Sequence, residues 1–145
     1  MTATDTSSQT ATKPIPVPDE LTAPFWEAAR QHRLAIQQCS HCETFHHPPV
    51  GICPPCLSTD LKFVDVSGRG YVYSYSIVRD QRLPAFDELM PYIVAEVRLH
   101  DAPGVRLLSN LPGTAIDEVR CGMEVQVDFE QIAEGVVIPQ FREAR

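Results

Sequence analysis

Alternation of apolar and polar side chains dominates the second half of the chain and predicts β-strands there. The segment YIVAEVRL (92–99) is the strongest example, because it places on one face Ile93, Ala95, Val97 and Leu99. Successive side chains of a strand point to opposite faces, so this face is predicted to contact a core. The same pattern predicts strands at residues 61–66, 71–78, 105–111, 124–132 and 135–141.

Within two of these strands the alternation assigns particular side chains to a face. In the strand at 124–132, the side chains predicted to point inward are Val125, Val127 and Phe129. The strand at 71–78 is predicted to place on one face Tyr71, Tyr73, Tyr75 and Ile77. Between the last long strands, the segment AIDEVRCGM (115–123) predicts one helical turn.

The segments before residue 61 follow other patterns. LTAPFWEAARQHR (21–33) predicts a short helix, with Thr22 as its N-cap and a proline in its first turn. Residues 33–38 alternate again and predict a strand. Residues 1–18 are rich in Thr, Ser and Pro, so we expect them to form a flexible N-terminal arm.

Many short strands with glycine and proline turns and one short helix are typical of a small closed barrel or sandwich. We therefore predict a mainly β protein with an OB-type barrel and a C-terminal tail over residues 61–145. The segment 79–91 is a long loop in this scheme, yet its apolar residues include Leu83, Phe86, Leu89 and Met90. It either meets a partner or ligand or folds over the barrel end.

Charge narrows the class of protein. The chain of 145 residues carries 12 basic and 19 acidic side chains, for a net charge of −7. Nucleic-acid binders present clustered Lys and Arg, so this balance argues against them. Binding of single-stranded nucleic acid stays an alternative function, because bases could stack on the tyrosines of residues 71–78. With no apolar run of ~20 residues and no signal-peptide pattern, we expect a cytoplasmic protein without a membrane segment.

The cysteines carry the clearest chemistry. CSHCETFHHPPVGICPPC (39–56) holds two C-x-x-C pairs separated by ten residues. Two such turns brought face to face complete a tetrahedral Cys₄ shell for Zn²⁺. We predict one structural zinc ion within a helix and zinc-ribbon unit over residues 19–60. Its ligands are Cys39, Cys42, Cys53 and Cys56.

Alternatives to this zinc site stay open at the level of sequence. A Cys₃His site would use one of the histidines 41, 46 and 47, which we otherwise expect at the surface. Iron in a Cys₄ site would make a rubredoxin-like electron carrier, although Glu43 and Leu57 stand where such turns commonly have glycine. Cys121, the fifth cysteine, is expected to be a small buried residue rather than a nucleophile.

Catalytic motifs are absent from the sequence. It contains no G-x-S-x-G elbow, no P-loop, no dinucleotide-binding glycine pattern and no H-E-x-x-H. We assign no catalytic residue, which favours a subunit that is not catalytic alone.

Several stretches, taken together, resemble the DUF35 family over roughly residues 20–143. They are PFWEAARQHRLAIQQCSHC, PPVGICPPC, VSGRGYVYSYSIV, PYIVAEVRLHDAPGVRLLSNL, CGMEVQVDFE and IPQFREA. The resemblance implies a rubredoxin-like zinc ribbon followed by an OB-fold. The chain departs from the family pattern at Glu43, where glycine is common, and at HHPPV (46–50), where an Arg or aromatic residue is common.

The resemblance also implies a function. DUF35 proteins are similar in being non-catalytic partners of thiolase-superfamily enzymes that act on acyl-CoA in lipid or steroid metabolism. These include thiolases, acyltransferases and retro-aldolases. We therefore expect a hetero-oligomer, such as a heterotetramer, with acyl-CoA shared at the interface.

Two sets of residues are candidates for contacts in such a complex. Exposed-looking apolar side chains of the helix and the long loop are expected at the partner interface: Phe25, Trp26, Leu83, Phe86 and Met90. Arginines are expected to meet the phosphates of CoA: Arg69, Arg79 and Arg82.

Overall fold

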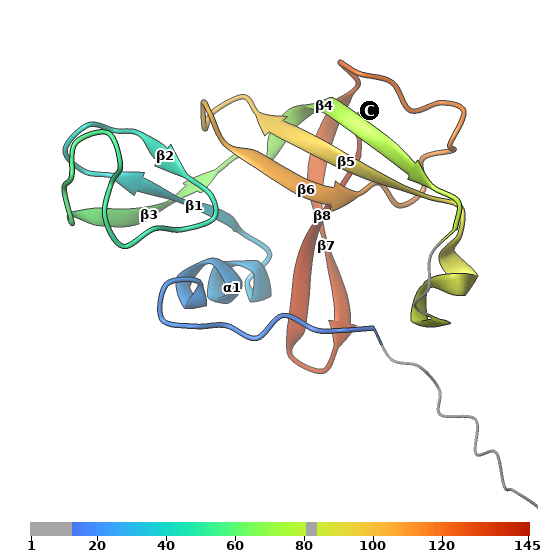
Figure 1. Cartoon of the computed structure of the whole chain (residues 1–145), viewed down its shortest axis with the longest axis horizontal. Helices are drawn as coiled ribbons and strands as arrows, with labels where there is room; N and C mark the ends of the chain where they lie inside the picture. Colours follow the sequence, from blue (N-terminus) through green and yellow to red (C-terminus); the bar gives the residue numbers. More distant parts are fainter. Residues whose placement is uncertain (1–12, 81–83) are drawn as a thin grey trace, which may run out of the picture.

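The computed structural model describes residues 13–80 and 84–145. Figure 1 shows two antiparallel sheets, with helix α1 (Ala23–Arg30) beside them. The smaller sheet has the order β2-β1-β3, with bounds Phe45–His46, Leu34–Cys39 and Leu61–Val66. The larger has the order β6-β5-β4-β7-β8, with bounds Arg106–Asn110, Tyr92–Leu99, Arg69–Val78, Glu124–Ala133 and Val136–Glu143. The fold is mainly β, as the sequence predicts.

Helix α1 is shorter than the predicted 21–33. It ends because His32 adopts a left-handed backbone (φ 56°). The amide N–H of His32 donates to the carbonyl of Ala29, and that of Arg33 to the carbonyl of Ala28, at 2.9 Å each. This is the Schellman arrangement that satisfies the last carbonyls of a helix. Thr22 is the N-cap residue, but its hydroxyl donates to Asp19 instead of accepting from the helix.

One hydrophobic core joins the helix, strand β1 and the five-stranded sheet. Phe25, Leu34 and Ile36 belong to the same buried cluster as the inward side chains of β5. The predicted inward face of β5 is confirmed, since its four residues are at most 4% exposed. In β7, Val125 is buried, while Val127 and Phe129 are half-buried against this core. The segment 115–123 forms hydrogen-bonded turns, not the predicted helical turn.

Strand β4 contains a β-bulge that changes which way its tyrosines point. Val72 pairs with Val97 and Ser74 with Glu96, so Tyr73 is an extra residue. Tyr71 therefore lies on the outward side with its partner Arg98, whereas Tyr75 pairs with the buried Ala95. A one-residue insertion exchanges the two faces of every later position. The prediction that the tyrosines share one face is wrong.

The edges of the five-stranded sheet meet through side chains, not through the continuous ladder of the expected closed barrel. Among the described residues, β6 and β8 form no backbone pairing. Instead, the Gln140 side-chain oxygen accepts hydrogen bonds from the Ser109 hydroxyl and the Asn110 amide N–H, both at 3.0 Å. The Ser109 hydroxyl also accepts from the Phe141 N–H at 3.1 Å. Buried polar groups thus fasten the two edge strands.

Candidate functional site

The cysteines lie in two turns of the same form. Strand β1 delivers Cys39, whose amide N–H donates to the Thr44 carbonyl (3.0 Å), while its carbonyl accepts from the Glu43 N–H (2.9 Å). In the second turn, the carbonyl of Cys53 accepts from the Leu57 N–H (2.7 Å). The Cys53 amide N–H donates to the carbonyl of Ser58 (2.9 Å).

Both turns require a left-handed residue directly after the second cysteine. The φ angles of Glu43 and Leu57 are 60° and 61°. A side chain in this region is strained, which is why glycine is common there. Glu43 and Leu57, the two positions where glycine is common in such turns, therefore have the left-handed backbone that favours glycine.

The turns bring four sulfur atoms into one cluster. The Sγ atoms of Cys39 and Cys56 are 3.6 Å apart, and those of Cys42 and Cys53 are 3.5 Å apart. All four Sγ atoms lie within 4.8 Å of one another. Tetrahedral zinc with Zn–S bonds of ~2.3 Å places sulfurs ~3.8 Å apart. The geometry and the donor set therefore suit zinc binding.

Hydrogen bonding and burial act in opposite directions on the pKa values of the thiols. The Thr44 hydroxyl, 3.2 Å from the sulfur of Cys42, and the backbone at Thr44 lower the pKa of that thiol to about 6. Burial raises the pKa of the Cys53 thiol to about 12. Hydrogen bonding favours the thiolate, and desolvation opposes it. Four thiolates so close together need a positive charge to be stable.

Histidines contribute no ligand atom to this cluster. His41 is exposed, but His46 and His47 are half-buried, which corrects the expectation of surface histidines. The His47 ring packs against Phe25 at a centroid distance of 5.0 Å, and burial lowers its pKa. Cys121 is exposed, so the expectation of a small buried residue is wrong.

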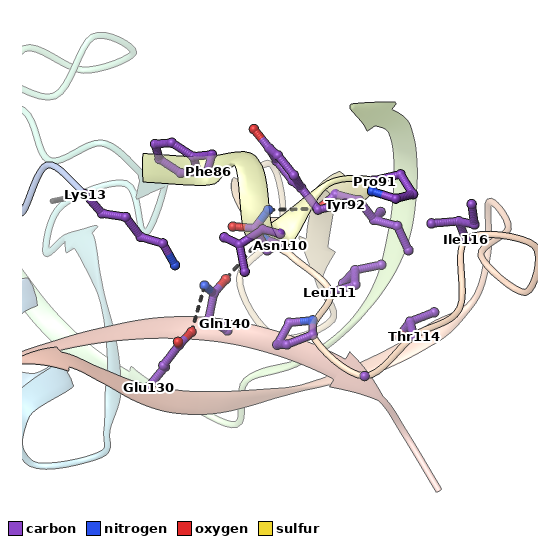
Figure 2. Close-up of a pocket in the computed structure, with 14 residues that line it drawn as sticks. Lys13, Phe86, Pro91, Tyr92, Asn110, Leu111, Thr114, Ile116, Glu130 and Gln140 are labelled. Atoms are coloured by element: carbon purple, nitrogen blue, oxygen red, sulfur yellow. Dashed lines mark hydrogen bonds between the residues drawn. The ribbon is translucent and has the colours of Figure 1, made fainter. Parts of the chain in front are cut away.

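A second feature is a pocket of about 340 Å³ beneath the 3₁₀ helix η1 (Pro84–Leu89). Figure 2 shows Phe86 and Tyr92 on one side and Leu111 and Ile116 on another. The amide of Gln140 donates to the Glu130 carboxylate at 3.2 Å. This segment of the predicted 79–91 loop therefore packs over part of the five-stranded sheet. The polar lining at Asn110 and Gln140 was not predicted, because amide side chains in strands carry no motif.

The candidate interface residues fall in different environments. Phe25 is 5% exposed and belongs to the core, contrary to its exposed-looking sequence context. Trp26 is half-buried and borders a groove of about 330 Å³ that also contacts Leu108 and His47. Phe86 and Met90 are half-buried. Leu83 lies outside the described residues.

The candidate phosphate-binding arginines do not form a cluster. Arg69 begins β4, and Arg79 follows its last residue; both are exposed. Ten residues of strand span roughly 33 Å, so these two guanidinium groups belong to different places on the surface. Arg82 lies outside the described residues. None of the helices in the described parts of the chain is long and apolar enough to cross a membrane.

Family models match most of the chain. Residues 26–62 match the ChsH2 rubredoxin-like zinc ribbon domain, and residues 63–130 match the ChsH2 C-terminal OB-fold domain. A "DUF35 domain-containing scaffold protein" of Pyrococcus furiosus is 35% identical over 112 residues, covering 76% of this chain and 79% of that protein. The chain belongs to the DUF35 family.

Two further relatives have informative names. A "Probable enoyl-CoA hydratase alpha subunit" of Thermomonospora curvata is 42% identical over 134 residues. The match covers 92% of this chain but 41% of that protein, so the chain spans about two fifths of its relative. A chain of the solved "Ltp2-ChsH2(DUF35) aldolase" is 41% identical with a TM-score of 0.81, covering 90% of this chain and 99% of that one.

Proposed function

We propose that this chain is a non-catalytic, zinc-containing accessory subunit of an acyl-CoA-processing complex. Its catalytic partner would belong to the thiolase superfamily, as a thiolase, an acyltransferase or a retro-aldolase. The observation that carries the proposal is the likeness to the DUF35 chain of the Ltp2-ChsH2 aldolase, which is matched over nearly its whole length. The enoyl-CoA hydratase relative supports the same substrate class.

The cysteine cluster supports a structural role for one zinc ion. A shell of four cysteine sulfurs leaves no open position for water or substrate. Zinc held by Cys39, Cys42, Cys53 and Cys56 would fix the two turns against each other. The ion would then stabilise the ribbon without taking part in the partner's reaction.

The surface beside α1 supports a role in assembly. Trp26 reaches the groove that it shares with Leu108, which is 77% exposed. At the other end of the sheet, Phe86 and Met90 carry apolar surface beside the η1 pocket. Aromatic and apolar anchors of this kind dominate the energetics of protein interfaces. Together with a dimeric enzyme, two copies of this subunit would form a heterotetramer.

Acyl-CoA would meet this subunit at single arginines and not at a built phosphate site. Arg69 and Arg79 are separate exposed candidates for such a contact. Each would add one charge-assisted hydrogen bond to a phosphate at the interface. The substrate would therefore be held mainly by the catalytic partner.

Affinity purification tests the proposal. The tagged chain is purified from its host, and proteins present in stoichiometric amount are identified by mass spectrometry, with the tag alone as control. We expect a thiolase-superfamily enzyme whose turnover of an acyl-CoA panel falls when this subunit is removed. Recovery of the chain alone, or of a complex with nucleic acid and a raised 260-nm absorbance, would contradict the proposed function.

A further inference from the structure

The outward side of strands β4, β5 and β6 carries a concentration of aromatic, cationic and apolar side chains. We call it the outer face and define it by Tyr73, Glu96, Arg98, Arg106 and Leu108. The register places Glu96 opposite Leu108 and Arg98 opposite Arg106. Their neighbours on the opposite side of the sheet, such as Val97 and Leu107, are buried in the core. The five side chains therefore share one surface.

The guanidinium group of Arg98 lies over an aromatic ring. Its guanidinium carbon lies 3.6 Å from the centroid of the Tyr73 ring. The face of a tyrosine ring attracts a cation placed over it, and this contact restricts the guanidinium group without using its hydrogen-bonding capacity. Nε of Arg98 is shielded from solvent and has no hydrogen-bond partner. Among the described residues, no carboxylate pairs with this arginine, so a preorganised cation lacks an acceptor.

The charge of the outer face is opposite to that of the whole chain. It carries two arginines and one glutamate, whereas the chain has a net charge of −7. Glu96 is already engaged, because its carboxylate accepts from Arg106 at 2.9 Å. This leaves Arg98 as the uncompensated positive charge. The complementary ligand of such a face is a carboxylate.

Leu108 adds an apolar contact to this cationic surface. It is 77% exposed in the middle of β6, where the opposite side of the strand is buried. It also borders the groove of about 330 Å³ that Trp26 lines. The outer face is thus continuous with the helix surface that the proposed function assigns to assembly. Trp, Tyr and Arg, which lie on these two adjoining surfaces, are the residue types enriched in interface hot spots.

We infer that the outer face docks an acidic surface of the enzyme partner, with an Asp or Glu carboxylate of that enzyme pairing with Arg98. Leu108 and the adjacent groove receive an apolar side chain of the same enzyme surface. This inference rests on the proposed function, because the occupant is the catalytic subunit. The guanidinium group fits carboxylate and phosphate alike. A protein carboxylate is favoured because the exposed Leu108 lies on the same face and offers an apolar contact that a protein surface can use and a phosphate group cannot.

Charge reversal at Arg98 gives the first test. The affinity of the purified enzyme for immobilised chain is measured with Arg98→Glu and with the matched control Arg120→Glu. Arg120 is exposed and outside the outer face. We expect Arg98→Glu to raise Kd by roughly tenfold or more and to flatten the dependence of Kd on salt. An Arg98→Glu affinity equal to that of the control would overturn the inference.

Carbodiimide coupling gives a second test that does not depend on weakening the complex. The chain has only two lysines, Lys13 and Lys62, so an Arg98→Lys substitution adds one distinctive amine. Arg98→Lys keeps the charge, and coupling in the complex should join position 98 to an Asp or Glu of the enzyme. An Arg120→Lys variant should give no such product.

The outcomes separate the two proposals. If no enzyme co-purifies with the unmodified chain, both the proposed function and the docking surface fall. If the enzyme binds Arg98→Lys but no peptide is joined at position 98, only the docking surface is overturned. A product joining position 98 to a second copy, formed without the enzyme, would also overturn it. Coupling of position 98 to a phosphate group of acyl-CoA, and not to the enzyme, would also overturn the docking surface.

Discussion

The zinc ribbon and the five-stranded sheet are stabilised in different ways. Over residues 39–60 the fully shielded side chains are those of Cys39 and Cys53, while the other side chains are half-buried or exposed. The larger sheet instead encloses a cluster of mainly aliphatic residues, with Phe141 the largest fully buried side chain. The ribbon therefore depends on its sulfur cluster, and the sheet depends on apolar burial.

The two kinds of stabilisation meet in strand β1. Strand β1 belongs to the ribbon sheet by its hydrogen bonds but to the larger core by its side chains Leu34 and Ile36. Phe25 joins the same core from α1. The energetic boundary therefore falls at Cys39, where β1 ends. Loss of metal should disorder the turns after β1 and leave α1 and β1 attached to the sheet.

The largest expected effect is the loss of one cysteine ligand. In Cys39→Ser the site loses a thiolate, and metal binding in such sites supplies on the order of 10 kcal/mol of folding free energy. We expect disorder of the segment 39–60 with retention of the larger sheet, measured by amide NMR signals and zinc content. Cys121→Ser is the matched control, because Cys121 is exposed and outside the cluster. A Cys39→Ser protein with bound zinc and unchanged ribbon signals would contradict the dependence on this ligand.

The converse change removes apolar contact from the larger core. Phe141 is 1% exposed, and truncation of a buried Phe to Ala costs about 3–5 kcal/mol. Phe141→Ala should lower the free energy of unfolding by that amount while the folded protein keeps its zinc, as measured by denaturant unfolding and metal analysis. Leu108→Ala removes an exposed apolar side chain and serves as control. Equal free energies of unfolding for the two variants would show that burial of Phe141 does not stabilise the sheet.

Sequence patterns predicted the parts of this structure that depend on local periodicity. Strands β5 and β3 have the predicted bounds. In β5 the alternation is regular and one side is buried. The four cysteines were predicted because two residues between ligands fit one turn around a metal. The DUF35 resemblance, confirmed by the family matches, supplied the order of ribbon and OB-fold.

Features that depend on long-range contacts were not predictable in this way. The bulge at Tyr73 carries no glycine and is visible only from the pairing of β4 with β5. The stack of Arg98 on Tyr73 joins side chains of two different strands, so it also depends on the pairing of β4 with β5. From its residue type alone, Phe25 could be an exposed interface residue or a core residue. Only the packing of α1 on the sheet shows that it belongs to the core. Burial is a property of the assembled fold and not of the residue type.

A smaller effect is expected at the polar contact between the edge strands. Gln140 is 8% exposed and accepts hydrogen bonds from Ser109 and Asn110. Gln140→Ala removes this acceptor from a buried site, which costs about 1–3 kcal/mol. We expect a lower melting temperature and faster amide exchange at Asn110, with Gln131→Ala on the exposed part of β7 as control. Unchanged exchange at Asn110 would mean that side chains do not fasten β6 to β8.

The smallest expected effect is a gain of stability in the ribbon. Leu57 is 75% exposed and has a φ angle of 61°. A left-handed backbone costs a non-glycine residue about 1–2 kcal/mol, and the extra chain entropy of glycine offsets about 0.5–1 kcal/mol of this. Leu57→Gly should therefore strengthen zinc retention by about 0.5–1 kcal/mol, measured by competition with a chelator. Leu57→Ala removes the same side chain but keeps Cβ, so it should show no gain. Equal zinc retention by the Gly and Ala variants would show that backbone strain at position 57 does not weaken the ribbon. A gain confined to Leu57→Gly, with unchanged unfolding of the larger sheet, would show that the two regions are stabilised independently.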